Sequence, residues 1–439
     1  MAGLLLLIPG SGVRPAAEPG RAELDPAWLI LGGVGQGARG ARMVAWRTDF
    51  GPGDGRKEGP TACFLSDLPQ ANRDRASGEG RDEAGDPSAT ARPRARELLG
   101  QVRELGGMCC NGHLELTPLA SGRLAVATTC AGQAGTWIYA EILGAGGKPA
   151  TPPLAVAPAR GRSQAIARLA PTVEGGAWIV WAEHDATFHE GATVRAAHLD
   201  SADEIDRGPL DLSPDGEALG TALSKSLSVT PLPDGGFAAA WIAHASSGEW
   251  LIHLARFDVS GKPSSKTISL HSPRWSNGAG ATLRLEADAS GRLSVVWQRR
   301  GKVADDPDRL AVASVSPKGE LLVEPSPVTV DEPRRTQSLG RFVTVGTRRL
   351  LVWYEHDPRS GEGWLAFRPW SPERGPIGLT RRVPAALAST WPFLEAVVEG
   401  DDALTLYWAP DGPEGLAIPG AVAWRRFTIG EPPRAPSAR

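Results

Sequence analysis

The stretch Pro233-Asp234-Gly235-Gly236-Phe237-Ala238-Ala239-Ala240-Trp241 decides the fold, because its pattern returns along the chain. A turn is followed by a short apolar run that ends in tryptophan, and the residues from Ser290 to Trp297 form the next clearest copy. The closing tryptophans follow one another at steps of 60, 56, 56 and 55 residues: Trp181, Trp241, Trp297, Trp353 and Trp408. A step of about 50 residues is typical of a radial or stacked repeat. The pattern predicts an architecture and leaves the ligand and the chemistry open.

Four short strands are predicted in the copy around Trp241. The strands are expected at Leu227–Leu232, Phe237–Ala243, Trp250–Asp258 and Lys266–Leu270. Glycine at a turn supplies positive φ at little steric cost, which places a turn between the first two strands. Four strands without a long amphipathic helix are the pattern of one propeller blade.

The other copies repeat this phasing, so we expect an all-β chain forming a single β-propeller of four-stranded blades. Third strands are expected at 138–143, 194–199, 310–315 and 365–370. Seven second-strand positions give seven blades: Trp46, Thr128, Trp181, Trp241, Trp297, Trp353 and Trp408. Six blades with an irregular N-terminal region is the alternative. Trp28–Leu31 and Ala421–Thr428 are the candidate strands for closing the ring, which would remove the exposed sheet edge.

The propeller is expected to span residues 25–430. Residues 51–97 are rich in Gly, Arg, Asp, Glu, Ala and Pro, and such a segment buries too little apolar surface to offset its ordering entropy. We therefore predict a disordered insertion there. Residues 1–24 are expected to be a flexible N-terminal segment or a signal remnant, and residues 431–439 a flexible tail.

Composition limits the possible partners. Apolar residues make up 41% of the chain, enough for a large core, and the formal charge of −3 predicts no binding to nucleic acid. No stretch approaches the roughly 20 apolar residues that a membrane span needs.

The run Leu4–Ile8 is like the apolar part of a signal peptide, although no Lys or Arg precedes it. We expect the chain to be exported to the periplasm, the cell surface or the medium. We also expect it to be a monomer.

The four cysteines lie in one region of the sequence: Cys63, Cys109, Cys110 and Cys130. A hairpin centred near Ser121 would bring Cys130 opposite Cys110, which makes that bridge feasible and leaves Cys63 to reach Cys109. A zinc site that includes His113 is the competing idea, but the chain has no C-x-x-C pair. Free, buried thiols are a third possibility.

The repeated tryptophans are interpreted as packing, because a large aromatic at one point of every blade fills the wedge between sheets. Trp137, Trp250 and Trp364 open third strands and are also expected to pack. Trp275 lies outside the repeat beside Arg274, and it is a candidate for stacking on a sugar ring or a partner side chain.

Polar residues follow several of the second strands. Trp181-Ala182-Glu183-His184-Asp185 and Trp353-Tyr354-Glu355-His356-Asp357 are near copies. Such residues form a speculative binding rim: Glu183, His184, Asp185, His244, Trp275, Arg300, Glu355, His356, Asp357 and Asp411. Three imidazoles beside carboxylates suit a divalent metal or acid–base chemistry. The alternative is duplication of an ancestral blade, and we predict no metal, no cofactor and no catalytic residue.

The sequence does not match the motifs of several other classes of catalytic and ligand-binding site. The chain lacks a G-x-S-x-G elbow, a Walker A loop, an H-E-x-x-H pair and an EF-hand loop. The Ser-x-Asp-x-Gly-x-Thr-Trp motif of sialidase-type propellers has its nearest counterpart in Asp357–Trp364, with the wrong spacing.

The segments from Asp234 to Trp241 and from Arg256 to Gly261 resemble the blade repeats of exported bacterial β-propeller proteins, of the type D-G-G-F-x-x-x-W followed by R-F-D-x-x-G. Weaker copies extend from about Leu114 to Phe427. The resemblance implies a propeller, export and a binding or surface role, and it supplies no catalytic residue. Cys109, Cys110 and Thr128 depart from the repeat.

The function expected from these observations is a non-catalytic binding or interaction module that recognises a protein or glycan partner through one rim. The alternative is a glycan-active enzyme, glycosidase or lyase-like, using a carboxylate pair from Glu183, Asp185, Glu355 or Asp357, which must lie roughly 5–10 Å apart. A purely structural module within a larger assembly is the third hypothesis.

Overall fold

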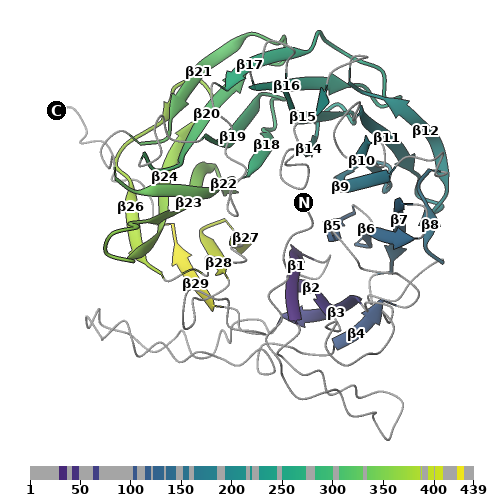
Figure 1. The fold of residues 1–439 in the computed structure, drawn as a ribbon, viewed down its shortest axis with the longest axis horizontal. Coiled ribbons are helices and arrows are strands. Elements are labelled where there is room, and N and C mark those ends of the chain that lie inside the picture. The colour runs from purple at the N-terminus through teal and green to yellow at the C-terminus, as the bar shows by residue number, and fades with distance from the viewer. Residues whose placement is uncertain are drawn as a thin grey trace, which may run out of the picture. The chain divides into compact units, whose positions relative to one another are not determined.

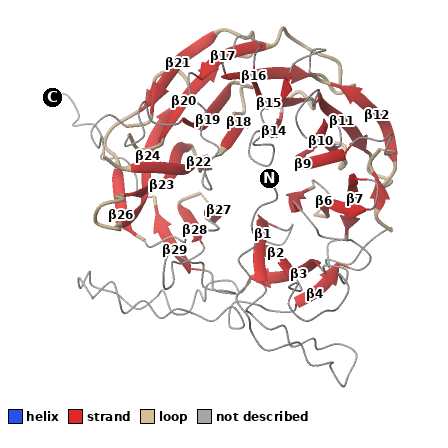
Figure 2. Cartoon of the chain, in the orientation of Figure 1, coloured by secondary structure: helices blue, strands red, loops and turns tan. Residues whose placement is uncertain are grey.

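The computed structural model describes strands and turns, and Figure 2 shows no helix in the described part of the chain. The described residues are 29–36, 42–48, 63–68, 102–105, 114–119, 122–132, 135–144, 152–157, 163–184, 193–213, 218–219, 227–244, 250–272, 282–299, 306–329, 334–385, 387, 394–399, 401–408 and 423–429. Within these residues no helix is long and apolar enough to cross a membrane. The chain divides into two compact units.

The first unit contains three antiparallel sheets, each with its strands in chain order (Figure 1). One holds β1 (Leu29–Gln36), β2 (Arg42–Thr48), β3 (Cys63–Leu68) and β4 (Val102–Leu105). The next holds β5 (Leu114–Pro118), β6 (Leu124–Gly132), β7 (Gly135–Leu143) and β8 (Leu154–Ala155). The third holds β9 (Ser163–Pro171), β10 (Ala177–His184), β11 (Thr193–Leu199) and β12 (Ile205–Asp211).

The second unit contains four antiparallel sheets. Their strands are β13 (Ala218–Leu219), β14 (Leu227–Pro231), β15 (Phe237–His244), β16 (Trp250–Phe257) and β17 (Ile268–Ser272); then β18 (Leu283–Ala287), β19 (Leu293–Arg299), β20 (Arg309–Val315) and β21 (Leu321–Pro327). They continue with β22 (Thr336–Val345), β23 (Arg348–His356), β24 (Gly363–Ser371), β25 (Gly375–Pro376) and β26 (Arg381–Pro384), and end with β27 (Leu394–Glu399), β28 (Ala403–Trp408) and β29 (Ala423–Thr428).

The four strands predicted around Trp241 are confirmed as β14 to β17, within two residues at each end. The turn between β14 and β15 requires two consecutive glycines, each for a different reason. Gly235 has a φ of 87°, which favours glycine. A Cβ added to Gly236 would lie 2.1 Å from the carbonyl oxygen of Phe257, so the second glycine lets the hairpin approach the third strand. Gly175 and Gly176 repeat both features.

One part of the expected insertion forms a strand. The segment 51–97 contains β3, which pairs with β2, because Cys63-Phe64-Leu65 supplies enough apolar surface for a third strand. The remaining residues of that segment, and residues 1–24 and 431–439, lie outside the described residues. Within their own units, β1 pairs with β2 and β29 pairs with β28, and closure of the ring by these two strands stays a prediction.

The repeated tryptophans pack between consecutive sheets within each unit, as predicted. Trp181, Trp241, Trp297 and Trp353 are at most 1% exposed. Trp297 belongs to a core cluster shared by the sheets of β15 and β19, and Trp353 to one shared by the sheets of β19 and β23. Burying an aromatic side chain removes roughly 150–250 Å² from water, which makes these layers a main source of stability.

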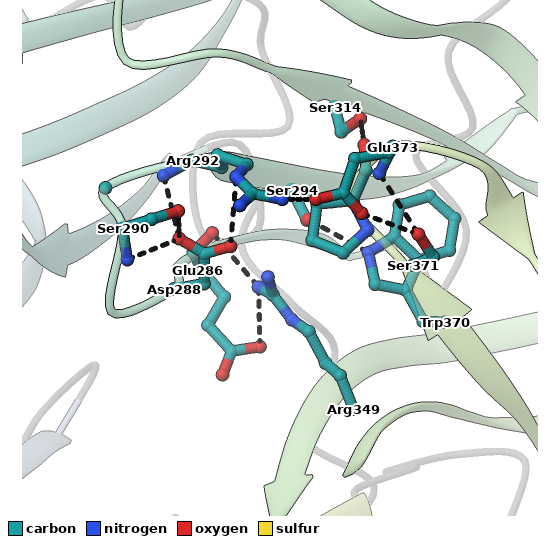
Figure 3. A network of polar contacts seen from close by, with 12 residues as sticks. Glu286, Asp288, Ser290, Arg292, Ser294, Ser314, Arg349, Trp370, Ser371 and Glu373 are labelled. Atoms are coloured by element: carbon teal, nitrogen blue, oxygen red, sulfur yellow. Dashed lines mark hydrogen bonds and ion pairs between the residues drawn. The ribbon is translucent and has the colours of Figure 1, made fainter. Parts of the chain in front are cut away.

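Arginines at one repeat position join a sheet to the turns of its successor. In the first unit Arg123, just before β6, donates to Asp203 Oδ1 at 3.0 Å and to the carbonyl of Ser201 at 2.9 Å. In the second unit Arg292, just before β19, pairs with Glu373 after β24. Figure 3 shows this second contact within a network of turn residues at the ends of the two sheets.

Other members of that network fix the turns. Asp288 accepts hydrogen bonds from the backbone N–H of Ser290 and of Arg292, both at 2.9 Å, which closes the hairpin between β18 and β19. The indole N–H of Trp370 donates to Ser294 Oγ at 3.0 Å (Figure 3). These contacts have a structural role at the turn ends of the sheets.

The first unit also buries a carboxylate. Glu141 lies in β7 opposite Val126 and is 1% exposed, and neither of its carboxylate oxygens has a hydrogen-bond partner in the structure. Burial raises the pKa of Glu141 to about 7.

The predicted disulfides stay a prediction. Cys109 and Cys110 lie outside the described residues, whereas Cys63 and Cys130 lie in β3 and β6.

Candidate functional site

The structure describes five of the predicted rim residues with their side chains: Glu183, His184, Glu355, His356 and Asp357. Glu183 and His184 are the last two residues of β10, in one unit. Glu355 and His356 are the last two residues of β23, in the other unit, and Asp357 follows them. His244 ends β15, but its side chain is not among those described. The others lie outside the described residues: Asp185, Trp275, Arg300 and Asp411.

The two near copies share a local backbone irregularity. A β-bulge interrupts the pairing of β9 with β10 and that of β22 with β23, next to the repeat tryptophan in each sheet. Ile166 and Leu339 occupy these bulges, and each has a φ of 56°, which is rare for a side chain with a Cβ. A shared strained backbone indicates that the likeness of the two copies extends beyond their second strands.

A glutamine on the first strand is the next shared element. Gln164 lies opposite Glu183, and Gln337 lies opposite Glu355. The Oε1 of Gln164 accepts a hydrogen bond from the backbone N–H of Ile138 at 3.0 Å. The Oε1 of Gln337 accepts the equivalent bond from Leu310 at 3.2 Å. Each glutamine thereby satisfies a backbone donor at the start of the preceding sheet's third strand.

Glu355 is the centre of a dense polar cluster in the second unit. Its carboxylate is fully buried, and its Oε1 accepts from the Trp353 indole N–H at 2.9 Å and from Gln337 Nε2 at 3.3 Å. Its Oε2 accepts from Arg382 Nε at 2.6 Å and from Arg335 Nη1 at 3.2 Å. Two guanidinium groups therefore share a single carboxylate.

The electrostatics of this cluster keep Glu355 ionised. Burial by itself would raise the pKa of Glu355, but the hydrogen bonds from Arg382 and Trp353 and the positive charge of Arg382 outweigh burial. The pKa of this carboxyl therefore lies below its ordinary value. A buried carboxylate that accepts so many hydrogen bonds suits the positioning of arginines and does not suit proton transfer to a ligand.

Glu183 has a simpler ion pair. Its Oε1 lies 3.4 Å from Arg195 Nη1, and the same arginine pairs through Nε with Asp211 Oδ1 at 2.7 Å. His184 beside it is 1% exposed. Among the described residues, one arginine thus lies between two carboxylates in the first copy, whereas two arginines share one carboxylate at Glu355.

Aromatic side chains surround the Glu355 cluster. The Arg335 guanidinium carbon lies 4.1 Å from the centroid of the Trp364 ring, and Trp364 is directly opposite Glu355 in the neighbouring strand. The rings of Tyr354 and His356 are stacked, with centroids 6.5 Å apart. Trp364 and His356 remain partly exposed, so this cluster presents aromatic surface and guanidinium groups together.

Asp357 has a local structural role. It is partly exposed and accepts a hydrogen bond from the backbone N–H of Arg359 at 2.8 Å, in the turn that leads to β24. This bond from Arg359 lowers the pKa of Asp357. Within the described ranges, no group of three or more His, Cys, Asp or Glu side chains is arranged to hold a metal ion.

Sequence reasoning missed Gln164, Gln337, Arg335 and Arg382. The glutamines had a usable signal, because each precedes its repeat tryptophan by 16 or 17 residues and follows a hydroxyl residue, Ser163 or Thr336. Arg335 and Arg382 had none, since they stand 20 residues before and 27 residues after Glu355, outside any repeated pattern.

Comparison with known proteins yields distant structural likenesses alone. No protein-family model and no curated protein sequence matches the chain. An ulvan lyase from a new family of polysaccharide lyases is similar at 11% identity and a TM-score of 0.47, covering 92% of this chain and 95% of that one. A protein of unknown function from Dyadobacter fermentans has 11% identity and a TM-score of 0.42, covering 72% and 94%. A sialidase of Trypanosoma rangeli in complex with sialic acid has 10% identity and a TM-score of 0.41, covering 75% and 56%.

Proposed function

We propose that this chain recognises a glycan at the end of sheet β22–β26 where the Glu355 cluster lies. The observation that carries the proposal is the stacking of Arg335 on the partly exposed Trp364 ring, beside a carboxylate that fixes Arg335 and Arg382. Saccharides bind to flat aromatic rings through their C–H faces and to planar polar side chains through their hydroxyl groups. Both kinds of group are held here on neighbouring strands.

Rigid support is what makes this cluster suitable for recognition. Glu355 is buried, and its contacts restrain the rotamers of two arginines that are themselves 19% and 23% exposed. A binding group that is already ordered loses little conformational entropy when a ligand arrives. Glu355 thus has a positioning role in this proposal.

The test is saccharide binding by the intact chain and by two matched tryptophan variants. Trp364→Ala is expected to weaken binding of a saccharide hit from a glycan panel at least tenfold, about 1.4 kcal/mol. Trp250→Ala is the control, because Trp250 also opens a third strand and packs on a core cluster. A panel without any hit, or equal losses in the two variants, would refute the proposal.

A glycan-active enzyme is the second candidate, and the placement of His356 favours it. This imidazole is partly exposed at the end of β23 and stacks on Tyr354, so it is accessible to a bound sugar. Glu355 does not suit the role of acid or base, for the reason given above. New reducing ends or unsaturated products from a polysaccharide, abolished by His356→Ala, would support catalysis.

The finer architecture belongs to the same proposal. We propose that the repeat forms one seven-bladed propeller, supported by the even tryptophan steps and by seven sheets among the described strands. An experimental map with rotational pseudo-symmetry of another order would contradict it. Export and the cysteine bridges remain proposals that mass spectrometry of the mature chain, before and after thiol labelling, would test.

A further inference from the structure

Two buried polar atoms on sheet β18–β21 lie across an interface from the Glu355 cluster. Within the part of the chain that the structure describes, neither Gln298 Oε1 nor Thr282 Oγ1 has a hydrogen-bond partner. Gln298 is only 3% exposed. A buried polar atom without a partner costs about 1–3 kcal/mol, so it calls for a physical reason such as a bound ligand or water.

Strand alternation shows which face of its sheet Gln298 occupies. Val296 of β19 packs in one core cluster with Trp353 of β23. Gln298 and Glu355 each follow one of these residues by two positions, and side chains two positions apart on a strand point to the same face. Gln298 and Glu355 therefore face the same interface, between sheet β18–β21 and sheet β22–β26 of the second unit.

Hydrogen bonds join Gln298 to the Glu355 cluster. Its Nε2 donates to Asp308 Oδ2 at 3.5 Å, which leaves Oε1 as the end of the amide without a partner among the described residues. The carbonyl of Asp308 accepts from the Gln337 N–H at 2.8 Å, and Gln337 Nε2 donates to Glu355. Thr282 is the strand neighbour of Gln298, whose backbone N–H donates to the Thr282 carbonyl at 3.1 Å. Directly opposite residues share a face of the sheet, so Thr282 also faces this interface.

These two atoms together suit the hydroxyl group of a sugar. The Gln298 amide oxygen accepts a hydrogen bond and the Thr282 hydroxyl group can donate one, while a sugar hydroxyl group both donates and accepts. We propose that Gln298 and Thr282 bind a hydroxyl group of a neutral sugar, across the interface from the partly exposed ring of Trp364. The inference rests on the proposed glycan function and makes Gln298 a specificity-determining residue for it. A sugar whose hydroxyl group points elsewhere leaves both atoms without a partner, so the site discriminates against that sugar.

The experiment measures binding of three neutral β-1,4-linked probes to the full-length chain by calorimetry: cellotetraose, mannotetraose and galactotetraose. Their sugar units differ in configuration at C2 or C4. We expect the wild type to bind one probe about tenfold tighter than another. Gln298→Leu keeps most of the side-chain volume and removes the amide, so we expect it to weaken the preferred probe about tenfold and to abolish the preference. The melting temperature of the unliganded variant should be unchanged or raised, because a buried atom without a partner is removed.

Two further variants separate binding from folding. Thr282→Val keeps the shape of the side chain without its hydroxyl group, and it should weaken the preferred probe about fivefold. Ser294→Ala is the matched control, because Ser294 is buried on β19 and follows the same alternation as Gln298, about 13 Å away along the strand. Ser294 Oγ accepts from the Trp370 indole N–H at 3.0 Å, so the control should lower the melting temperature and leave the affinity unchanged.

Each contrary result has its own meaning. Equal affinity of the wild type for all three probes, or an affinity and preference that Gln298→Leu retains, would overturn the inference and leave the glycan proposal standing. A loss of affinity that Ser294→Ala shares would also overturn it, because the loss would then follow from packing. If Gln298→Leu does not fold, an unchanged affinity in Thr282→Val has the same force. Binding of none of the three probes would overturn the assignment to a neutral sugar, and the glycan panel decides separately whether Trp364 binds any saccharide.

Discussion

Sheet β9–β12 and sheet β22–β26 share a tryptophan, a glutamate and a histidine at the end of the second strand, a bulge in the first strand and a glutamine that reaches the preceding sheet. They differ in the charges around the glutamate. Among the described residues, Arg195 pairs with both Glu183 and Asp211, whereas Arg335 and Arg382 both pair with Glu355.

The difference shows which part of the motif is architecture and which part is specific. The bulge and the glutamine recur in both sheets, so they belong to the way these sheets are built. The second arginine, the stacked Trp364 and the indole bond from Trp353 occur at Glu355, and they turn a shared scaffold into a rigid polar and aromatic surface. The candidate site therefore lies in what the second copy adds.

Neutralising Glu355 and Glu183 in turn should give the largest difference in the free energy of unfolding between the two sheets. Glu355→Gln removes the buried negative charge that Arg335 and Arg382 share, and breaking a buried ion pair costs about 3–5 kcal/mol. Glu183→Gln leaves Arg195 with Asp211, so a smaller loss of about 1.5 kcal/mol is expected. Urea unfolding of each variant measures these losses. Equal losses would mean that the extra arginine contributes nothing to stability.

The next largest effect should be the loss of stability at low pH, which we expect in the wild type and not in Glu355→Gln. The pKa of Glu355 is lowered in the folded chain, so its stabilising effect is complete above the ordinary glutamate value and is lost as the pH falls through the folded value. Hydrogen exchange of β23 amides, with β10 as the internal reference, should show protection falling more than tenfold from pH 6 to pH 3 in the wild type. A decline of the same size in Glu355→Gln would contradict this assignment.

Replacing the paired tryptophans by phenylalanine tests the indole bond. Both replacements remove a similar volume from a packed core, but Trp353 also donates to an ionised carboxylate, whereas the Trp181 N–H has no hydrogen-bond partner among the described residues. Trp353→Phe should therefore cost about 1.5–3 kcal/mol more than Trp181→Phe in chemical unfolding. No difference would indicate that the bond is absent in solution.

The glutamines should show the smallest contrast, because both perform the same task. Gln164→Ala and Gln337→Ala each leave a buried backbone N–H unsatisfied, at about 1–3 kcal/mol. We expect the two losses to agree within about 1 kcal/mol, with Gln337 the larger through its bond to Thr329 Oγ1. Thermal unfolding of both variants provides the measurement, and a loss in one variant alone would break the proposed equivalence.

Repeated local signals explain how much of the fold could be predicted. The glycine pair at Gly235 and the repeat tryptophan near the end of most second strands act over a few residues, so strand positions followed directly from the sequence. The third strand β3 was missed because three apolar residues stand within a long polar segment. The two-residue strands β13 and β25 are too short to create any periodicity.

The site was less accessible to sequence reasoning. Glu355 was identified through its near copy, but its role was not, because that role depends on Arg335 and Arg382, which the fold brings together from distant parts of the chain. Asp357, selected for its carboxylate, proved to close a turn.

The bare carboxyl group of Glu141 makes folding a proton-consuming reaction. Its folded pKa of about 7 exceeds the ordinary glutamate value, so between these limits the native chain holds a proton that the unfolded chain releases. This residue therefore makes the native chain steadily less stable from weakly acidic to neutral pH, with no further loss above that. Near pH 6, the heat absorbed on melting should accordingly vary with the ionisation enthalpy of the buffer, and Glu141→Gln should remove that part of the variation.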